Sequence, residues 1–142
     1  SSWFTDHPTV PIDSIVAQLN ADMIGRNADT LLYVVGPLAA PNNQSRRLGA
    51  ILDSVNAAFP TPFKLNREWD SATHPEHIYE RSDHFNYARK GIPIVFVTTG
   101  LHDDYHKVSD EPRKIDFAKL ARVTRLMAEM GRAVANSPKR PR

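Results

Sequence analysis

The sequence of 142 residues contains no cysteine. Disulfide bonds and thiolate metal sites are therefore both excluded, although this absence says little about the cellular compartment. The sequence also lacks any run of about 18 apolar residues and any segment with the pattern of a signal peptide. It thus predicts neither a membrane span nor a leader, and a leader could have been removed.

A large excess of charge of one sign is also lacking. The formal net charge is +2, and Lys139, Arg140 and Arg142 of the C-terminal stretch SPKRPR contribute three of the cations. Because the rest of the chain is then nearly neutral, a nucleic-acid-binding surface is not expected. With 41% hydrophobic and 24% charged residues, the chain is typical of one globular domain or a large part of one.

Apolar runs and helical periodicity alternate along the chain. The expected strands are an apolar stretch at 15–19 that ends near 20–22, residues 30–36, a short strand within FKLNRE at 63–68, and PIVFVTT at 93–99. The expected helices are residues 43–59, a short helix with Ser82 as N-cap and Gly91 after its end, and a long helix capped by Asp116. On the long helix, one apolar face is expected to hold Phe117, Leu120, Thr124, Met127, Gly131 and Val134. This order indicates an α/β sheet covered by helices.

Both ends of the chain lack a regular pattern. Residues 1–11 carry turn formers and two prolines, and they are expected to lead into the domain from elsewhere. Residues 137–142 are expected to form a flexible tail. His7, His74 and His77 lie in predicted loops and are interpreted as surface residues.

The stretch TTGLHDDYHKVSDEP, residues 98–112, combines two histidines with several acidic residues. His102 and His106 are spaced as in the HExxH helix, where both histidines bind one metal. That hypothesis needs a helix, whereas the stretch follows a β-branched run that ends at Gly100 and is soon followed by a proline. The alternative is a loop past the end of a strand, where α/β folds place ligands. Asp22, at the end of another predicted strand, could then face the same crevice.

Taken singly, these residues have ordinary explanations. Asp22 can cap a turn, and an isolated histidine in a polar loop is usually solvated or hydrogen-bonded. The tripeptide SDH at 82–84 can be an N-cap followed by an acid in the first helical turn. Local patterns alone therefore leave a metal site and a structural interpretation open.

The order of three segments is more informative. IVAQLNADMIGR, SDHFNYARKGIPIVFVTTG and HDDYHKVSDEPRKIDFAKLARVTRLM together resemble the C-terminal half of the co-catalytic zinc aminopeptidases. This is the family of the bacterial leucyl aminopeptidases, with relatives among glutaminyl cyclases and glutamate carboxypeptidases. SSWFTDHPTVP resembles the family's segment leading to its aspartate-bearing strand, so the likeness covers nearly the whole chain. It implies a mixed, mostly parallel sheet flanked by helices, with residues 1–142 as the C-terminal part of one catalytic domain.

The resemblance also implies roles for individual residues. Asp22 corresponds to a terminal carboxylate ligand of one zinc ion, and His106 corresponds to a ligand of the other. Tyr105 corresponds to the tyrosine that hydrogen-bonds the oxyanion of the tetrahedral intermediate in many members. Asp83 and His84 correspond to a structural element under the site.

Carboxylate and imidazole groups suit zinc, and a water held between two such ions loses a proton near neutral pH. Asp110 follows His106 closely in the sequence. It is expected either to accept a hydrogen bond from a metal ligand or to brace the loop.

Part of the family's ligand set is missing from this sequence. Members carry, further upstream, a His-x-Asp segment whose aspartate bridges the metals and a Glu-Glu pair that supplies the general base and a ligand. The glutamates here are Glu68, Glu76, Glu80, Glu111 and Glu129, with no two adjacent. The chain is therefore interpreted as a piece that holds half of a two-zinc site and is inactive alone. Its expected partners are a peptide substrate and the rest of the catalytic domain upstream of Ser1.

Three functions remain to be compared. The leading hypothesis is a metal-dependent exopeptidase that removes N-terminal residues from peptides and, from the resemblance, is secreted or periplasmic. A glutaminyl cyclase-like acyltransferase would use the same scaffold, but those relatives tend to have Trp where Tyr105 stands. A non-catalytic peptidase-like binding module would have lost its metals. The retention of Asp22, Tyr105 and His106 argues against that third hypothesis, which the residues before Ser1 would decide.

Overall fold

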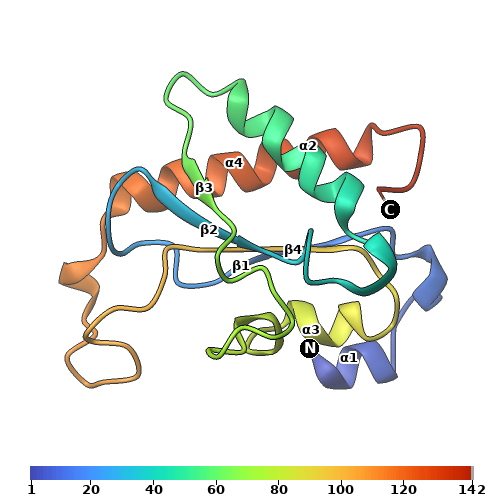
Figure 1. Cartoon of the computed structure of the whole chain (residues 1–142), viewed down its shortest axis with the longest axis horizontal. Helices are drawn as coiled ribbons and strands as arrows, with labels where there is room; N and C mark the ends of the chain where they lie inside the picture. Colours follow the sequence, from blue (N-terminus) through green and yellow to red (C-terminus); the bar gives the residue numbers. More distant parts are fainter. Residues whose placement is uncertain (142) are drawn as a thin grey trace.

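A computed structural model describes residues 1–141 and shows a sheet between two layers of helices (Figure 1). The α-helices are α1 (Ser2–Asp6), α2 (Arg46–Ala57), α3 (His84–Ala88) and α4 (Phe117–Ala135), and the strands are β1 (Gln18–Ala21), β2 (Leu31–Val35), β3 (Lys64–Asn66) and β4 (Ile94–Thr98). Short 3-10 turns occur at η1 (Ile12–Ser14), η2 (Pro41–Asn43), η3 (Ile78–Glu80) and η4 (Pro112–Lys114). The strand order in this range is β1-β4-β2-β3, and only the β2–β4 pairing is antiparallel. The predicted α/β fold with a mixed, mostly parallel sheet is confirmed.

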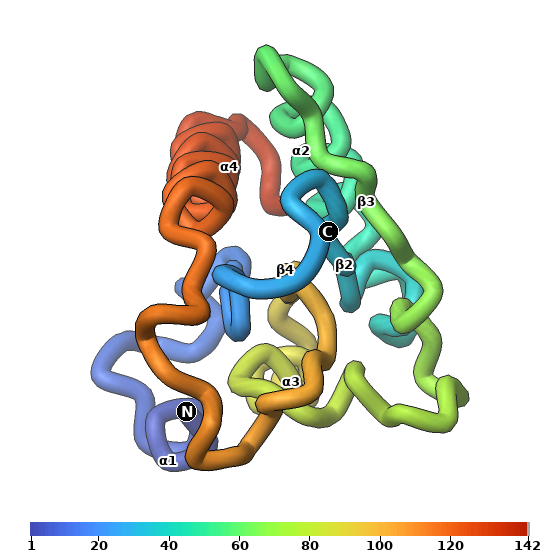
Figure 2. The backbone as a smooth tube through the Cα atoms, turned by 90° about the vertical axis from the view of Figure 1, so that its left-hand side faces the viewer, coloured from blue at the N-terminus to red at the C-terminus, as the bar shows by residue number. Residues whose placement is uncertain are grey.

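Helices cover both faces of the sheet, with α2 and α4 on one side and α3 with α1 on the other (Figure 2). The central strand β4 is buried along its whole length. Its Val95 and Val97 join the core that contains α2 and α4, whereas Ile94 and Phe96 join the core on the side of α3. Burial on both faces explains why this strand reads as an unbroken apolar run.

Several element boundaries differ from the prediction. The predicted strand from residue 15 is wrong at its start, since β1 begins at Gln18 and η1 precedes it. The helix predicted from residue 43 begins at Arg46, because Asn42 and Asn43 have left-handed φ values of 55° and 55°. The five-residue α1 was not predicted, since so short a helix leaves no periodic pattern.

The apolar face of α4 is shifted by one residue from the predicted face. Its buried residues are Lys119, Val123, Leu126 and Met130. Phe117 is 64% exposed and Thr124 is also exposed, so both were wrongly placed on the buried face. Lys119 can be buried on this face because its ammonium donates hydrogen bonds to the backbone carbonyls of Arg26 and Ala28 at 2.7 and 2.6 Å. Burial lowers the pKa of Lys119, and these carbonyls satisfy two of its donors.

The two ends of α4 are well defined. The Asp116 side chain accepts a hydrogen bond from the backbone N–H of Lys119 at 2.9 Å, so the predicted N-cap is confirmed. After α4, Arg140 donates a hydrogen bond to the carbonyl of Asp13. Residue 142 of the predicted tail lies outside the described residues. Within residues 1–141, no helix has the length and apolar character needed to cross a membrane.

A buried carboxylate ties the segment after β3 to the sheet. Asp70 accepts hydrogen bonds from the backbone N–H groups of Gly36, Leu38 and Ala39 at 2.7, 2.8 and 2.9 Å. Burial raises the pKa of Asp70, while these three donors oppose that shift by stabilising the carboxylate. Gly36 has φ +117°, and a Cβ there would lie 2.1 Å from Ile94 Cδ1, so this approach requires glycine.

Candidate active site

The carboxyl ends of β1 and β4 lie side by side at one edge of the sheet. The N–H of Asp22 donates to the carbonyl of Val97 at 3.2 Å, and the N–H of Thr99 donates to the carbonyl of Met23 at 3.0 Å. A crevice of about 30 Å³ opens there, lined by Asp22, Met23, Trp69, Ile78, Arg81, Ser82, Phe96, Thr98, Gly100, Leu101 and Tyr105. Parallel strand ends are the usual place for a ligand site in an α/β sheet. The structure thus brings Asp22 and Tyr105 to one crevice.

Asp22 is held by a serine that also lines this crevice. Its Oδ2 accepts a hydrogen bond from Ser82 Oγ at 3.0 Å, and Asn20 Nδ2 donates to the same hydroxyl at 2.9 Å. The prediction that Ser82 caps a helix is wrong, because α3 begins at His84 with Asp83 as its N-cap residue. A serine before a short helix has the pattern of a cap. Its actual partner is 60 residues away in the sequence, so no local signal identifies it.

Tyr105 and His106 lie on a loop without helical structure at 101–111, so the helix required by the two-histidine hypothesis is absent there. The His106 side chain is exposed and stacks on the Tyr105 ring, with 3.9 Å between ring centroids. Its backbone is left-handed at φ 57°, which is uncommon outside glycine. The His102 side chain, in contrast, is only 6% exposed and places Nε2 3.9 Å from Asp110 Oδ2. The two histidines therefore have different environments.

Arg81 adds a positive charge to the crevice that the sequence analysis did not identify. Its Nη2 donates a hydrogen bond to the Tyr105 hydroxyl at 3.3 Å, and its guanidinium carbon lies 5.8 Å from the centroid of that ring. Its Nη1 lies 3.3 Å from Glu76 Oε2. A cation beside Tyr105 favours the binding of a group on which negative charge develops. The only sequence signal for Arg81 was its position directly before the SDH tripeptide.

His84 lies behind the crevice. Its ring is fully buried, stacks on Phe96 at 4.6 Å, and places Nε2 2.7 Å from the Tyr79 carbonyl oxygen. Burial lowers the pKa of His84 from 6.5 to about 4, so the ring is neutral near neutral pH. Asp83 has the opposite orientation, since its side chain is 68% exposed and accepts a hydrogen bond from Ser1 Oγ at 2.7 Å. The structural role implied for these two residues stays a prediction.

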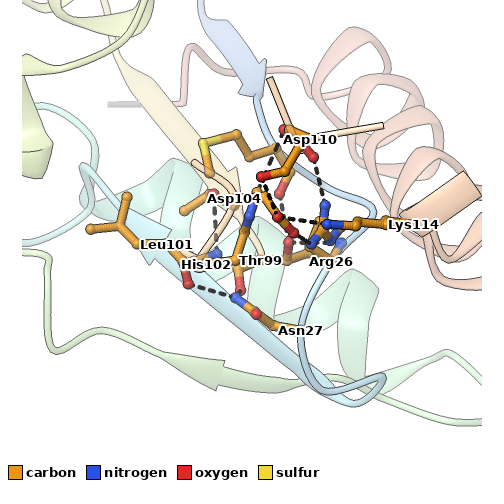
Figure 3. A network of polar contacts seen from close by, with 12 residues as sticks. Arg26, Asn27, Thr99, Leu101, His102, Asp104, Asp110 and Lys114 are labelled. Atoms are coloured by element: carbon orange, nitrogen blue, oxygen red, sulfur yellow. Dashed lines mark hydrogen bonds and ion pairs between the residues drawn. The ribbon is translucent and has the colours of Figure 1, made fainter. Parts of the chain in front are cut away.

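Asp110 contacts an arginine from the segment after β1. Its Oδ1 accepts a hydrogen bond from Arg26 Nη1 at 2.5 Å, within the network of polar contacts drawn in Figure 3. Arg26 also binds Asp104, and Lys114 with Ser109 and Arg26 holds the pKa of the Asp104 carboxyl well below its usual range. The contact of Asp110 with Arg26 connects the loop 101–111 to the segment after β1, which is what a residue that braces the loop would do.

Asp22 and His106 suit zinc in the kind of donor atom but not in number. Within residues 1–141, no group of three or more His, Asp or Glu side chains is arranged to hold a metal ion. Structural and catalytic zinc sites need at least three protein ligands. Larger pockets elsewhere in the described residues do not supply a set of metal ligands either. One of about 290 Å³ between α2 and α4 contains a single carboxylate, that of Glu129.

The chain was compared with known proteins. Residues 1–131 match the family described as peptidase family M28. No curated protein matches significantly. Among solved structures, the crystal structure of the Legionella pneumophila LapA aminopeptidase matches with a TM-score of 0.63 and 16% sequence identity.

That match covers 96% of this chain and 34% of the Legionella protein, so the chain spans about a third of its length. At so low an identity, the structural match shows a shared fold. The resemblance to zinc aminopeptidases found in the sequence is confirmed at the level of the superfamily. Because the family match extends over nearly the whole chain, the chain belongs to peptidase family M28.

Proposed function

We propose that the complete protein is a zinc-dependent exopeptidase that removes N-terminal residues from peptides by means of a metal-activated water. Half of the site would lie in this chain. The observation that carries the proposal is the meeting of Asp22 and Tyr105 in one crevice, with His106 stacked on Tyr105, in a chain of a peptidase family. In this proposal the isolated chain is inactive, and the complete protein is secreted or periplasmic.

Asp22 and His106 would each supply one ligand, and the remaining ligands and the general base would come from the rest of the catalytic domain. When bound, zinc lowers the pKa of water and polarises the peptide carbonyl. Ser82 orients the Asp22 carboxylate through its hydrogen bond at 3.0 Å. Tyr105 would donate a hydrogen bond from its hydroxyl group to the carbonyl oxygen as negative charge develops on that oxygen.

The different environments of the two histidines give a direct test. In the complete protein, His106→Ala should abolish one metal site and nearly all turnover, because it removes a ligand. His102→Ala is the matched control, since the buried His102 side chain shapes the loop and should leave the zinc content close to normal. The measurements are zinc per protein by elemental analysis and hydrolysis of an aminoacyl anilide.

An equal loss of zinc in both variants would instead revive the hypothesis that both histidines bind one metal. Normal zinc content in His106→Ala would remove this residue from the ligand set. Cyclisation of an N-terminal glutamine in place of hydrolysis would favour the acyltransferase alternative.

A further inference from the structure

The guanidinium group of Arg26 bridges two carboxylates of the loop 101–111, which carries Tyr105 and His106 (Figure 3). Its Nη2 donates to Asp104 Oδ2 and its Nη1 donates to Asp110 Oδ1, both at 2.5 Å. The Arg26 side chain is only 16% exposed. Hydrogen bonds between ionised partners are stronger than neutral ones and weaken less with salt when partly buried. One side chain thus fixes the loop at two points.

Asp104 is the centre of this network. Its Oδ1 accepts hydrogen bonds from Ser109 Oγ at 2.7 Å and from Lys114 Nζ at 2.6 Å, while Oδ2 is bound to Arg26. Both oxygens are therefore engaged, and the side chain is 15% exposed. Asp104 directly precedes Tyr105 in the chain, so its fixed position limits where the Tyr105 ring can lie.

The backbone around Arg26 is itself held in place. Its carbonyl accepts a hydrogen bond from the buried Lys119 of α4 at 2.7 Å. Its N–H donates to Thr99 Oγ1 at 3.3 Å, and Asn27 Nδ2 donates to the carbonyls of Thr99 and Leu101 at 2.9 and 2.9 Å. Helix α4 and the end of β4 therefore give Arg26 a fixed base from which its side chain reaches the loop.

On the basis of the proposed function, we infer that Arg26 is a positioning residue that holds Tyr105 at the crevice, with His106 stacked on it, through Asp104 and Asp110. It acts on the loop and not on the substrate. A displacement of about 1 Å at a catalytic group can cost on the order of 100-fold in rate. Loss of the Arg26 bridge should therefore lower turnover without removing any catalytic group.

The test uses three variants of the complete protein at saturating zinc. Arg26→Gln removes the charge and the two-pronged contact, whereas Arg26→Lys keeps the charge but cannot form both planar contacts. The matched control is Arg122→Gln, because Arg122 of α4 binds Asp29 at 2.7 Å, away from the loop. Arg26→Gln should lower kcat about 10- to 100-fold with little change in KM, and Arg26→Lys should have an intermediate kcat. The control should stay within about twofold of the parent, because the described contacts of Arg122 are with Asp29, Thr61 and the Phe63 ring and not with the loop 101–111.

A double-mutant cycle shows whether Arg26 acts through Asp104. Asp104→Asn should lower kcat to a similar extent, and adding Arg26→Gln to it should cost less than about threefold more, because both changes break the same contact. Losses that multiply in the double variant would overturn the inference. So would a kcat of Arg26→Gln equal to that of the parent.

Amide hydrogen exchange separates this inference from the proposed function. Arg26→Gln should speed exchange across residues 101–111, and Arg122→Gln should not. If the parent hydrolyses no aminoacyl anilide but the exchange result holds, the proposed function fails and the loop attachment stands. Unchanged exchange in both Arg26 variants would overturn the positioning role whatever the activity.

Discussion

The Tyr105 hydroxyl accepts a hydrogen bond from Arg81 at 3.3 Å, so its own hydrogen can be donated to a second acceptor. If that acceptor is the oxygen of the scissile carbonyl, the interaction strengthens only as negative charge develops there. Tyr105→Phe should then lower kcat more than it raises KM. The loss of one oxyanion donor costs about 100- to 1000-fold, or about 3 to 4 kcal/mol.

The measurement is the steady-state hydrolysis of an aminoacyl anilide by the complete Tyr105→Phe protein, with zinc content determined in parallel. Phenylalanine keeps the ring that stacks on His106 at 3.9 Å, so a purely packing role would leave kcat unchanged. An unchanged kcat at full zinc occupancy would exclude Tyr105 from the mechanism. The proposed functional residues of this chain would then be Asp22 and His106.

At the residue scale, what could be predicted depends on how far apart the partners lie in the sequence. Asp22 and Tyr105 were found because each follows an apolar strand within a segment that resembles a known family. Arg81 and Ser82 were missed because their roles come from contacts with Tyr105 and Asp22, 24 and 60 residues away. Local patterns do not record such contacts.

At the scale of single elements, a strand or helix is also harder to predict when its burial depends on contacts with residues far away in the sequence. The central strand β4 was predicted closely because burial on both faces requires an unbroken apolar run. The buried face of α4 was misplaced by one residue, and one of its four buried residues is Lys119, a residue that a hydrophobic periodicity counts as polar. Its ammonium is nevertheless buried against the carbonyls of Arg26 and Ala28, which only the tertiary structure supplies.

His84, the first residue of α3, predicts how the free energy of unfolding depends on pH. Burial lowers the pKa of His84 to about 4 in the folded protein, against 6.5 for the ordinary group. Between these values the unfolded chain binds more protons at this position than the folded chain does. The free energy of unfolding should therefore fall as the pH is lowered from 6.5 to about 4, and this contribution is fully present above pH 6.5.

Urea unfolding of the complete protein across that pH range measures this effect, with His84→Gln as the comparison. The variant loses the titrating ring, so its free energy of unfolding should depend less steeply on pH, although the variant itself is less stable. Carboxylates titrate in both proteins and cancel in the difference. Identical pH dependence of the two proteins would mean that His84 keeps an ordinary pKa in the folded state.

At the scale of the whole molecule, this chain forms a sheet with helices on both faces, whereas the proposed metal site needs further ligands from outside the chain. The match to the Legionella aminopeptidase covers 96% of this chain but 34% of that protein. The layers of helices, the mixed sheet and the crevice at the ends of β1 and β4 are all formed by residues 1–141. The division of the metal site stays a prediction from the sequence, which carries the apolar pattern of a sheet but no adjacent pair of glutamates.

The proposed half-site predicts how the isolated chain binds zinc. The proposed function assigns Asp22 and His106 to different zinc ions, so each ion would have one protein ligand from this chain. Zinc sites in proteins use three or four protein ligands, and one ligand leaves most coordination positions to water. Calorimetric titration of the chain with zinc should therefore show no tight site, once circular dichroism has shown that the chain is folded. Two tight sites would contradict both the half-site proposal and the assignment of Asp22 and His106 to separate ions.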